Sequence, residues 1–347
     1  MSIYFYMLLP SSHTLKELLT LSPTQHEFIL STQKTIQHLL SRKDPRIAII
    51  AGPCSIHDKT AALEYALKFK ELAESVAGSC FLVMRVYIEK PRTSTGWKGY
   101  LYDPYLDGSY DIEAGLIATR ELLLDLASLQ IPAAAEFVDP LAAPYFSDLI
   151  SWGFIGARTS ASQPHRQLAS LLHLPIGFKN ATDGNVDDAI HGVTASMTSH
   201  TFLHVNEDGK IASVQSSGNP YTHIVLRGSY ESTNYDVKNI KETLKKMQVA
   251  EISARLLVDC SHGNCQKLHE KQKDAFHAVI KQISEGNQHI LGVMLESHLH
   301  SGNQPLDFPL QYAVSITDPC IDWQATKELI LEAHALLAEK TETLQLN

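Results

Sequence analysis

The sequence has few cations, few cysteines and no long hydrophobic run, and each shortage excludes a class of protein. Its 29 Lys and Arg residues are outnumbered by 38 Asp and Glu residues, which gives a net charge of −9 at pH 7. Broad binding to nucleic acid or to an anionic membrane needs a surplus of cations, so neither partner is expected. Any anionic ligand must instead meet a local cluster of cationic side chains.

Cysteine usage and hydropathy place the protein in a reducing compartment. The five cysteines cannot all be paired, and a chain of 347 residues needs no disulfide framework to fold, so we expect the cytoplasm. No apolar run approaches the roughly 20 residues of a membrane span. The apolar segment 1–10 has no basic start and no small-residue cleavage site, and we interpret it as an interaction arm.

From residue 46 onward, short apolar runs alternate with amphipathic stretches. Continuous apolar runs are typical of parallel strands that are buried on both faces. The expected strands are residues 47–52, 81–88, 132–137, 154–158, 175–179, 223–227, 255–260 and 290–295. The amphipathic stretches have helical period. They are residues 59–76, 112–129, 143–151, 165–172, 186–199, 237–249, 268–284 and 325–337.

Eight strands alternating with eight helices predict an α/β fold, a (β/α)8 TIM barrel, which typically takes about 250 residues. Residues 1–45 stand outside this repeat, and we expect an N-terminal helical extension that serves as an oligomer or regulatory arm. Residues 46–347 would form the catalytic barrel. Within it, residues 201–218 alternate in polarity around a turn and predict a small β-hairpin before the sixth strand.

In such barrels the chemistry lies where the strands end. Most of the expected strands end at or near a charged or metal-competent residue. These residues are Cys54, Arg85, Glu136, Arg158, Lys179, Arg227, Asp259 with His262, and Glu296. They divide into a candidate set of metal ligands and a cationic set.

Four residues that are far apart in sequence come together if the barrel closes, namely Cys54, His262, Glu296 and Asp318. A thiolate, an imidazole and two carboxylates suit one divalent transition ion, which could be manganese, iron, cobalt or zinc. Taken singly, a cysteine after a strand is more often a buried packing residue, and a loop histidine is usually only solvated. The metal site therefore depends on their joint placement.

Arg85, Arg158, Lys179 and Arg227 form the cationic set. A single cation at a strand end is ordinarily a solvated rim charge. Four cations in one funnel would repel one another unless an anion lay between them, and guanidinium groups match phosphate and carboxylate oxygens. The set predicts a ligand that carries phosphate and also carboxylate.

The loop after the second strand adds Lys90, Arg92, Thr93 and Lys98. Glycines in the same loop permit close approach of the backbone to a ligand. A second anion could bind there, whereas the plainer alternative is a mobile basic surface loop.

Blocks of sequence along nearly the whole chain resemble type I 3-deoxy-D-arabino-heptulosonate 7-phosphate (DAHP) synthases, the group sensitive to phenylalanine, tyrosine or tryptophan. They include GPCSIHD (52–58), MRVYIEKPRTSTGWKGYLYDP (84–104), GARTSASQPHRQLAS (156–170), GFKNATDGN (177–185), HIVLRGS (223–229), DCSHGNCQK (259–267), GVMLESHLHSGNQ (292–304) and SITDPC (315–320). The resemblance implies a homodimer or homotetramer that condenses phosphoenolpyruvate with erythrose 4-phosphate and water. The products would be DAHP and phosphate, in the first step of the shikimate pathway to aromatic amino acids.

The resemblance also implies roles for individual residues. The metal ligands would be Cys54, His262, Glu296 and Asp318. Phosphoenolpyruvate would be held by Arg85, Lys90, Arg158, Lys179 and Arg227, with Glu136 beside them. Arg92 and Thr93 would take the phosphate of erythrose 4-phosphate. We expect Lys90 to protonate the developing alkoxide, because neighbouring cations and a metal would lower its pKa.

An aromatic amino-acid effector would bind between the loop after the third strand and the helix after the fourth. The candidate residues are Asp139, Pro144, Leu168, Leu171, Leu172 and His173. The chain departs from the family here, since Leu171 and His173 stand where sensitive members tend to have small residues and Pro144 lies one place late. Whether an effector acts, and which one, is left open by the sequence.

Three other functions fit the sequence less well. The closest rival is 3-deoxy-D-manno-octulosonate 8-phosphate synthase, but its relatives carry a different motif at residues 90–93. A simple metal-dependent aldolase leaves the cationic set unexplained, and an inactive scaffolding barrel would be expected to have lost site residues, of which none is missing.

Cys320 lies close in sequence to Asp318, so oxidation without metal is expected to join it to Cys54.

Overall fold

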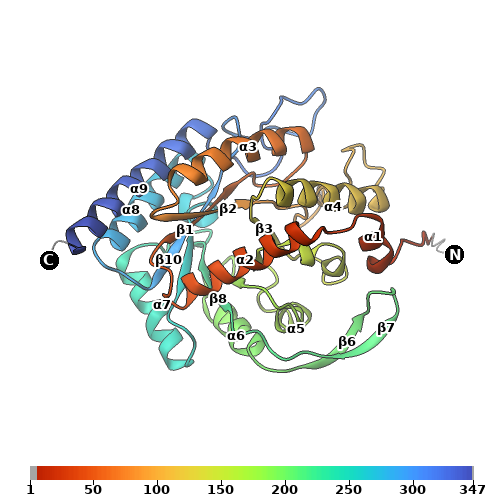
Figure 1. Ribbon diagram of the computed structural model, residues 1–347, viewed down its shortest axis with the longest axis horizontal. Coiled ribbons are helices and arrows are strands. Elements are labelled where there is room, and N and C mark those ends of the chain that lie inside the picture. Colours follow the sequence, from red (N-terminus) through yellow and green to blue (C-terminus); the bar gives the residue numbers. More distant parts are fainter. Residues whose placement is uncertain (1–5, 346–347) are drawn as a thin grey trace.

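The chain folds into the predicted (β/α)8 barrel (Figure 1). The computed structural model describes residues 6–345, with side chains as far as residue 338, so part of the predicted interaction arm, residues 1–5, lies outside the described residues. Eight parallel strands close in the order β1-β10-β9-β8-β5-β4-β3-β2. They are β1 (Ile47–Gly52), β2 (Cys80–Arg85), β3 (Ala133–Glu136), β4 (Trp152–Ile155), β5 (Ile176–Lys179), β8 (Thr222–Leu226), β9 (Leu256–Asp259) and β10 (Ile290–Glu296).

Helices surround the barrel and bury one apolar face each against it. They are α3 (Lys59–Ser75), α4 (Ile112–Ser128), α5 (Gln163–Leu171), α6 (Asp187–Ser196), α7 (Val237–Val249), α8 (Gln272–Ser284) and α9 (Trp323–Gln345). Capping carboxylates explain several of the starts. Asp58 accepts hydrogen bonds from two amides in the first turn of α3, and Asp236 does the same for α7. After β9 the chain first makes two short 3-10 turns, η3 (His262–Cys265) and η4 (His269–Lys271).

The helix predicted at residues 143–151 is wrong. The segment forms only two 3-10 turns, η1 (Ala143–Tyr145) and η2 (Ser147–Leu149). Pro144 donates no backbone hydrogen bond, Ile150 is already extended, and β4 begins two residues later. Too few residues remain between these points for successive α-helical hydrogen bonds, and 3-10 turns are the usual form of such short connections.

The N-terminal extension consists of α1 (Ser12–Leu18) and α2 (Pro23–Leu40). Helix α2 lies across the end of the barrel at which the strands begin. Its Ile36 and Leu39 are fully buried in one cluster with side chains of the barrel interior, among them Trp152 and Leu257. The extension therefore closes this end of the barrel, and the active site must open at the other.

The predicted hairpin before the sixth barrel strand is formed by β6 (Thr201–Val205) and β7 (Ile211–Gln215), which pair antiparallel. It extends away from the barrel toward α1 (Figure 1). Backbone N–H of His13 donates to the carbonyl of Glu207 over 2.9 Å, and Lys16 forms an ion pair with the Glu207 carboxylate at 2.7 Å. Among the residues described, no helix has the length and apolar character needed to cross a membrane.

Candidate active site

The strand ends surround a cavity of about 280 Å³ at the end of the barrel opposite α2. Eleven of the twelve predicted catalytic, substrate-binding and metal-binding residues line it. They are Arg85, Lys90, Arg92, Thr93, Glu136, Arg158, Lys179, Arg227, His262, Glu296 and Asp318. The twelfth, Cys54, is fully buried just behind the wall.

The predicted metal ligands lie together. One ligand atom each from Cys54, Glu296 and Asp318 forms a group in which all atoms are within 4.8 Å of one another. His262 stands outside that group, but its Nε2 is 3.5 Å from Oε1 of Glu296. A sulfur, two carboxylates and an adjacent imidazole suit a divalent transition ion, and the chemistry of these donors leaves the choice of ion open.

Lys90 is buried against the metal-ligand group, by which we mean the predicted ligands Cys54, Glu296 and Asp318. Its Nζ lies 3.0 Å from Sγ of Cys54 and 3.3 Å from the Cys54 carbonyl oxygen. Burial alone would lower the pKa of Lys90, but the nearby Cys54, Asp318 and Glu296 together raise it above the ordinary value. In the protein without metal the acidic neighbours thus outweigh burial and Arg85, and the lowered pKa of Lys90 expected with a bound metal stays a prediction.

Arg85 connects the cationic set to the metal-ligand group. Its guanidinium is fully buried, and Nη2 lies 2.9 Å from Oε1 of Glu296. Cζ of the same guanidinium lies 3.4 Å from the centroid of the Tyr87 ring, and Nε donates to the carbonyl of Pro53. These contacts fix the guanidinium, so Arg85 also orients a predicted metal ligand.

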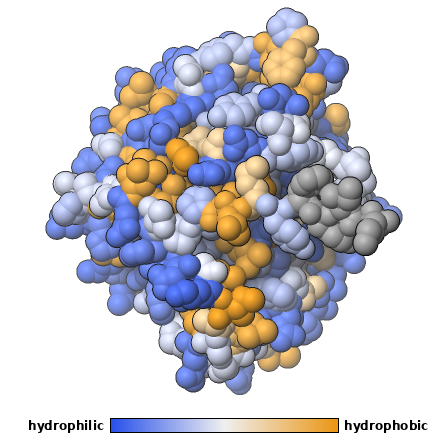
Figure 2. Space-filling model, turned by 90° about the vertical axis from the view of Figure 1, so that its right-hand side faces the viewer, coloured by the Kyte–Doolittle hydropathy of each residue, from blue (hydrophilic) through white to orange (hydrophobic). Residues whose placement is uncertain are grey.

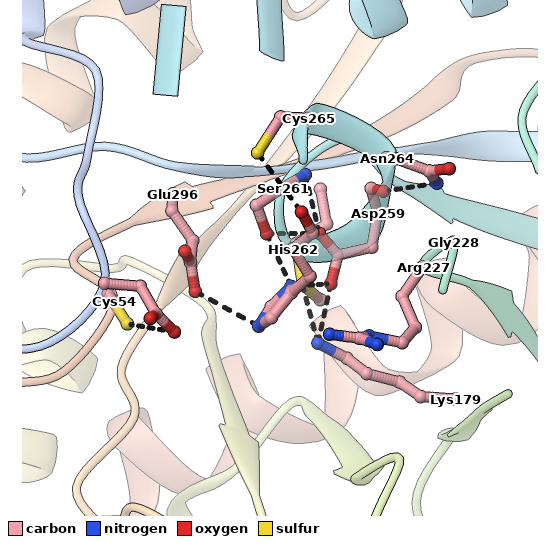
Figure 3. A network of polar contacts seen from close by, with 12 residues as sticks. Cys54, Lys179, Arg227, Gly228, Asp259, Ser261, His262, Asn264, Cys265 and Glu296 are labelled. Atoms are coloured by element: carbon pink, nitrogen blue, oxygen red, sulfur yellow. Dashed lines mark hydrogen bonds and ion pairs between the residues drawn. The ribbon is translucent and has the colours of Figure 1, made fainter. Parts of the chain in front are cut away.

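Asp259 joins Lys179 to His262 (Figure 3). Its Oδ2 lies 2.7 Å from Nζ of Lys179 and 3.0 Å from Nδ1 of His262. Burial would raise the pKa of Asp259, but Lys179 and His262 hold it well below the usual value. A carboxylate at Nδ1 favours the tautomer that leaves Nε2 free to bind a metal. The sequence marked Asp259 as a strand end but gave it no role. The feature that could have pointed to such a role is a charged residue at the end of a continuous apolar run.

Arg227 is the unsatisfied member of the cationic set. Its Nη1 is buried and has no hydrogen-bond partner, and burial lowers the pKa of the guanidinium. Arg158 lies on the neighbouring wall and donates from Nε to Oγ1 of Thr93 over 2.9 Å. A buried cation without a partner on a cavity wall is a site at which an anion would be stabilised.

Two glycines make room for predicted substrate-binding residues. A Cβ on Gly156 would lie 2.0 Å from Oε1 of Glu136, so only glycine leaves that carboxylate its place. Gly96 has φ +140°, and a Cβ there would lie 2.4 Å from Nη2 of Arg92. The loop after β2 thus depends on glycine both for its conformation and for the position of Arg92.

The six candidate regulatory residues do not share one cavity. Asp139 and Pro144 line a cavity of about 460 Å³ between the start of α1, the loop after β3 and the turn of the hairpin. Leu168 lines a neighbouring cavity of about 630 Å³ beneath the hairpin strands. The remaining three, Leu171, Leu172 and His173, lie at and after the end of α5 and line neither of these two cavities.

The model of the family described as the DAHP synthetase I family matches residues 27–331. The chain belongs to this family. The Tyr-sensitive phospho-2-dehydro-3-deoxyheptonate aldolase of Escherichia coli is 46% identical over 323 residues, which cover 92% of this chain and 90% of the relative. The Trp-sensitive enzyme of Enterobacter agglomerans is 43% identical over 320 residues, with 92% and 90% covered.

A solved structure of phospho-2-dehydro-3-deoxyheptonate aldolase from Francisella tularensis SCHU S4 superposes with a TM-score of 0.95. Its sequence is 40% identical, and the match covers 98% of this chain and 99% of that one. The predicted family and its activity, DAHP synthesis, are confirmed. The octulosonate 8-phosphate alternative finds no support.

Proposed function

We propose that the residues around the 280 Å³ cavity carry out DAHP synthesis in the roles predicted for them. The observation that carries this proposal is the buried, unpartnered Nη1 of Arg227 beside a group of metal-competent ligands. Phosphoenolpyruvate would bind with its anionic groups against the cationic set. The ligands are Arg85, Lys90, Arg158, Lys179 and Arg227, with Glu136 beside them.

The second substrate would bind at the loop after β2, with its phosphate on Arg92 and Thr93. Arg158, from the first anion site, contacts Thr93, from the second, so the two sites are fixed relative to one another. Together they would hold two mutually repelling substrates in position to react. Carbon 3 of phosphoenolpyruvate then attacks the aldehyde, Lys90 donates its proton to the developing alkoxide, water adds at carbon 2, and phosphate leaves.

The group of Cys54, Glu296 and Asp318, together with the adjacent His262, would hold one divalent transition ion, manganese, iron, cobalt or zinc. When bound, the ion supplies Lewis-acid polarisation of the aldehyde. The chain's own contribution is to fix the ligands: Asp259 orients His262, and Arg85 holds Glu296.

Equilibrium dialysis against Mn²⁺ or Zn²⁺ tests this ligand set. The wild-type protein should bind one ion per chain, and Cys54→Ala and His262→Ala should each weaken binding by more than the roughly 10–100-fold that loss of a group orienting a ligand costs. Cys80→Ala is the matched control, since Cys80 is buried at the start of β2. Wild-type affinity in Cys54→Ala would remove that residue from the proposed set.

An aromatic amino acid is the proposed effector, consistent with the Tyr-sensitive and Trp-sensitive names of the relatives. The cavity beside α1 offers the Asp139 carboxylate for an ammonium group and the apolar Ile112 and Leu116 for a ring. Phenylalanine, tyrosine and tryptophan, each added in excess to the assay, should include one inhibitor, and Asp139→Asn should weaken its effect. No inhibition by any of the three would contradict an effector of this class.

The same face is the proposed contact between subunits of a homodimer or homotetramer. Large apolar side chains are exposed on the N-terminal segment and on the hairpin, including Met7, Leu8, Leu203 and Ile211. Figure 2 views this side of the molecule and shows hydrophobic patches among hydrophilic ones. Sedimentation of Leu203→Glu/Ile211→Glu should give smaller species than wild type.

The proposed compartment is the cytoplasm, where five free thiols stay reduced.

A further inference from the structure

A second charged cavity, of about 480 Å³, opens at the end of the barrel opposite the active site. Its walls include three arginines and one aspartate, namely Arg42, Arg46, Arg255 and Asp44. Apolar side chains form much of the remaining wall, among them Pro45, Ile47, Ile283, Ile290 and Leu337. None of its lining residues borders the catalytic cavity.

Arg255 is the most deeply placed cation of this cavity, with 7% of its surface exposed. It donates from Nη2 to the carbonyl of Leu39 at the end of α2 over 2.7 Å, and from Nη1 to the carbonyl of Gln288. Its Nε is buried and has no partner. Burial, helped by Arg42, lowers the pKa of Arg255 to about 10. In the part of the chain that the structure describes, no carboxylate pairs with it, so carbonyl dipoles alone oppose its charge.

Arg42, at the mouth of the cavity, is also left without a carboxylate among the ion pairs of the described residues. Its Nη2 lies 3.1 Å from Nδ1 of His289. That Nδ1 also lies 2.9 Å from the carbonyl oxygen of Ala254. One ring nitrogen cannot accept from Arg42 and donate to Ala254 at once. When it donates to Ala254, Nη2 of Arg42 is free to meet a ligand, while Nη1 lies 3.5 Å from Oε1 of Gln288.

Arg46 differs from these two arginines because its charge is already balanced. Its Nη2 lies 2.6 Å from Oδ2 of Asp44, its Nε also donates to that carboxylate, and its guanidinium covers the Phe81 ring. The aspartate of the cavity is therefore neutralised within the wall. What remains is the charge of two arginines beside an apolar surface.

We propose that this cavity binds a small organic carboxylate with an apolar body. The carboxylate would lie against Arg42 and Arg255, because guanidinium groups hold carboxylates by paired, charge-assisted hydrogen bonds. The body would contact Ile283, Ile290 and Leu337. A compact inorganic anion would satisfy the arginines but leave those walls in water, and the volume lies in the range of small-molecule sites.

The position of the cavity gives binding a structural consequence. Ile47 starts β1, Ile290 starts β10, and Arg255 directly precedes β9. An occupant would therefore join the beginnings of the three strands whose other ends lead to the predicted metal ligands. Because it binds only the folded chain, it should raise the unfolding temperature.

Titration calorimetry of the full chain with benzoate tests the proposal, with phosphoenolpyruvate present in saturating amount to occupy the catalytic cavity. Benzoate should bind under these conditions, while neutral benzamide and inorganic phosphate should each bind at least tenfold more weakly. Arg42→Gln should weaken benzoate binding at least tenfold, and Arg255→Lys should do so too because lysine lacks the planar fork. Lys43→Gln is the matched control, since this neighbouring exposed cation does not line the cavity.

Arg42 is exposed, so its replacement should leave the fold and the turnover number unchanged, and benzoate should raise the melting temperature of wild type but not of Arg42→Gln. The proposal is overturned if phosphoenolpyruvate displaces benzoate, if Arg42→Gln binds benzoate as wild type does, or if phosphate binds as tightly as benzoate. Failure of benzoate to bind at all would also overturn it. None of these outcomes bears on DAHP synthesis, which is assayed separately.

Discussion

Nζ of Lys90 lies 3.0 Å from Sγ of Cys54, which places the proposed proton donor in contact with the proposed soft metal ligand. The two residues come from the loops after β2 and β1, which pair side by side in the barrel, and this pairing brings the loops together. The contact explains why acidic neighbours outweigh burial in setting the pKa of Lys90.

Replacement of Lys90 by methionine should reduce turnover by about 10²–10⁴-fold, the usual contribution of a positioned acid or base. Methionine keeps much of the length and packing of the side chain but cannot donate a proton. Steady-state kinetics with both substrates saturating measure the effect. Lys98→Met is the control from the same loop, because Lys98 is exposed and does not line the cavity. Near-normal turnover of Lys90→Met would exclude the proposed role.

Arg227→Gln should raise the KM for phosphoenolpyruvate by about 10–100-fold, because a charge-assisted hydrogen bond contributes roughly 1.5–3 kcal/mol. The buried Nη1 has no hydrogen-bond partner among residues 6–345, so a substrate oxygen is the group that it would bind. The KM for erythrose 4-phosphate should change much less. Initial-rate kinetics with each substrate varied separate the two effects, and equal changes in both constants would argue for general disruption of the site.

The strand ends could be predicted from sequence because parallel barrel strands all present their carboxyl ends to one face. Charged residues that follow continuous apolar runs must therefore meet, as Arg85, Lys179 and Arg227 do. The pattern does not say how such residues pair. The ion pair of Lys179 with Asp259 depends on side-chain positions that no sequence period encodes.

The helix predicted at 143–151 failed for a physical reason. The segment has helical period, but the closeness of β4 and the proline within it leave room only for 3-10 turns. The candidate effector residues were grouped by resemblance, and their grouping stays a prediction: Pro144 and Leu168 line neighbouring cavities, and Leu171 and His173 line neither of the two. The pKa of Lys90 in the protein without metal also depends on adjacent anionic groups, which the sequence alone does not place beside it.

Glu89 should make stability depend on pH. It is fully buried, where burial raises its pKa from 4.5 to about 8. Between these two values the folded chain holds a proton that the unfolded chain has lost, so stability falls as pH rises through the window and levels off above it. Glu89→Gln should remove this contribution, whose slope is at most about 1.4 kcal/mol per pH unit.

Urea unfolding at pH 5, 6, 7 and 8 measures the effect as the difference between wild type and Glu89→Gln. The exposed Glu71, replaced by glutamine, is the control and should follow wild type at every pH. A constant difference between wild type and Glu89→Gln across the window would show that Glu89 does not titrate there.

Oxidation of the metal-free protein should join Cys54 to Cys320 and abolish activity. Both thiols are free and fully buried, and Cys320 follows Asp318, a proposed metal ligand, by two residues. Metal should protect by occupying the Cys54 thiolate. Peptide mapping after oxidant treatment identifies the product, and Cys320→Ser should resist inactivation. Inactivation with both thiols still free would exclude this disulfide as the cause.

Phosphate release from phosphoenolpyruvate tests the central claim most directly, when it is measured before chelation, after exhaustive chelation and after Mn²⁺ is restored. Release should require erythrose 4-phosphate, should not be supported comparably by arabinose 5-phosphate, should disappear on chelation and should return with the metal. Activity that survives thorough chelation would contradict the metal-dependent site, and preference for arabinose 5-phosphate would contradict the assigned second substrate.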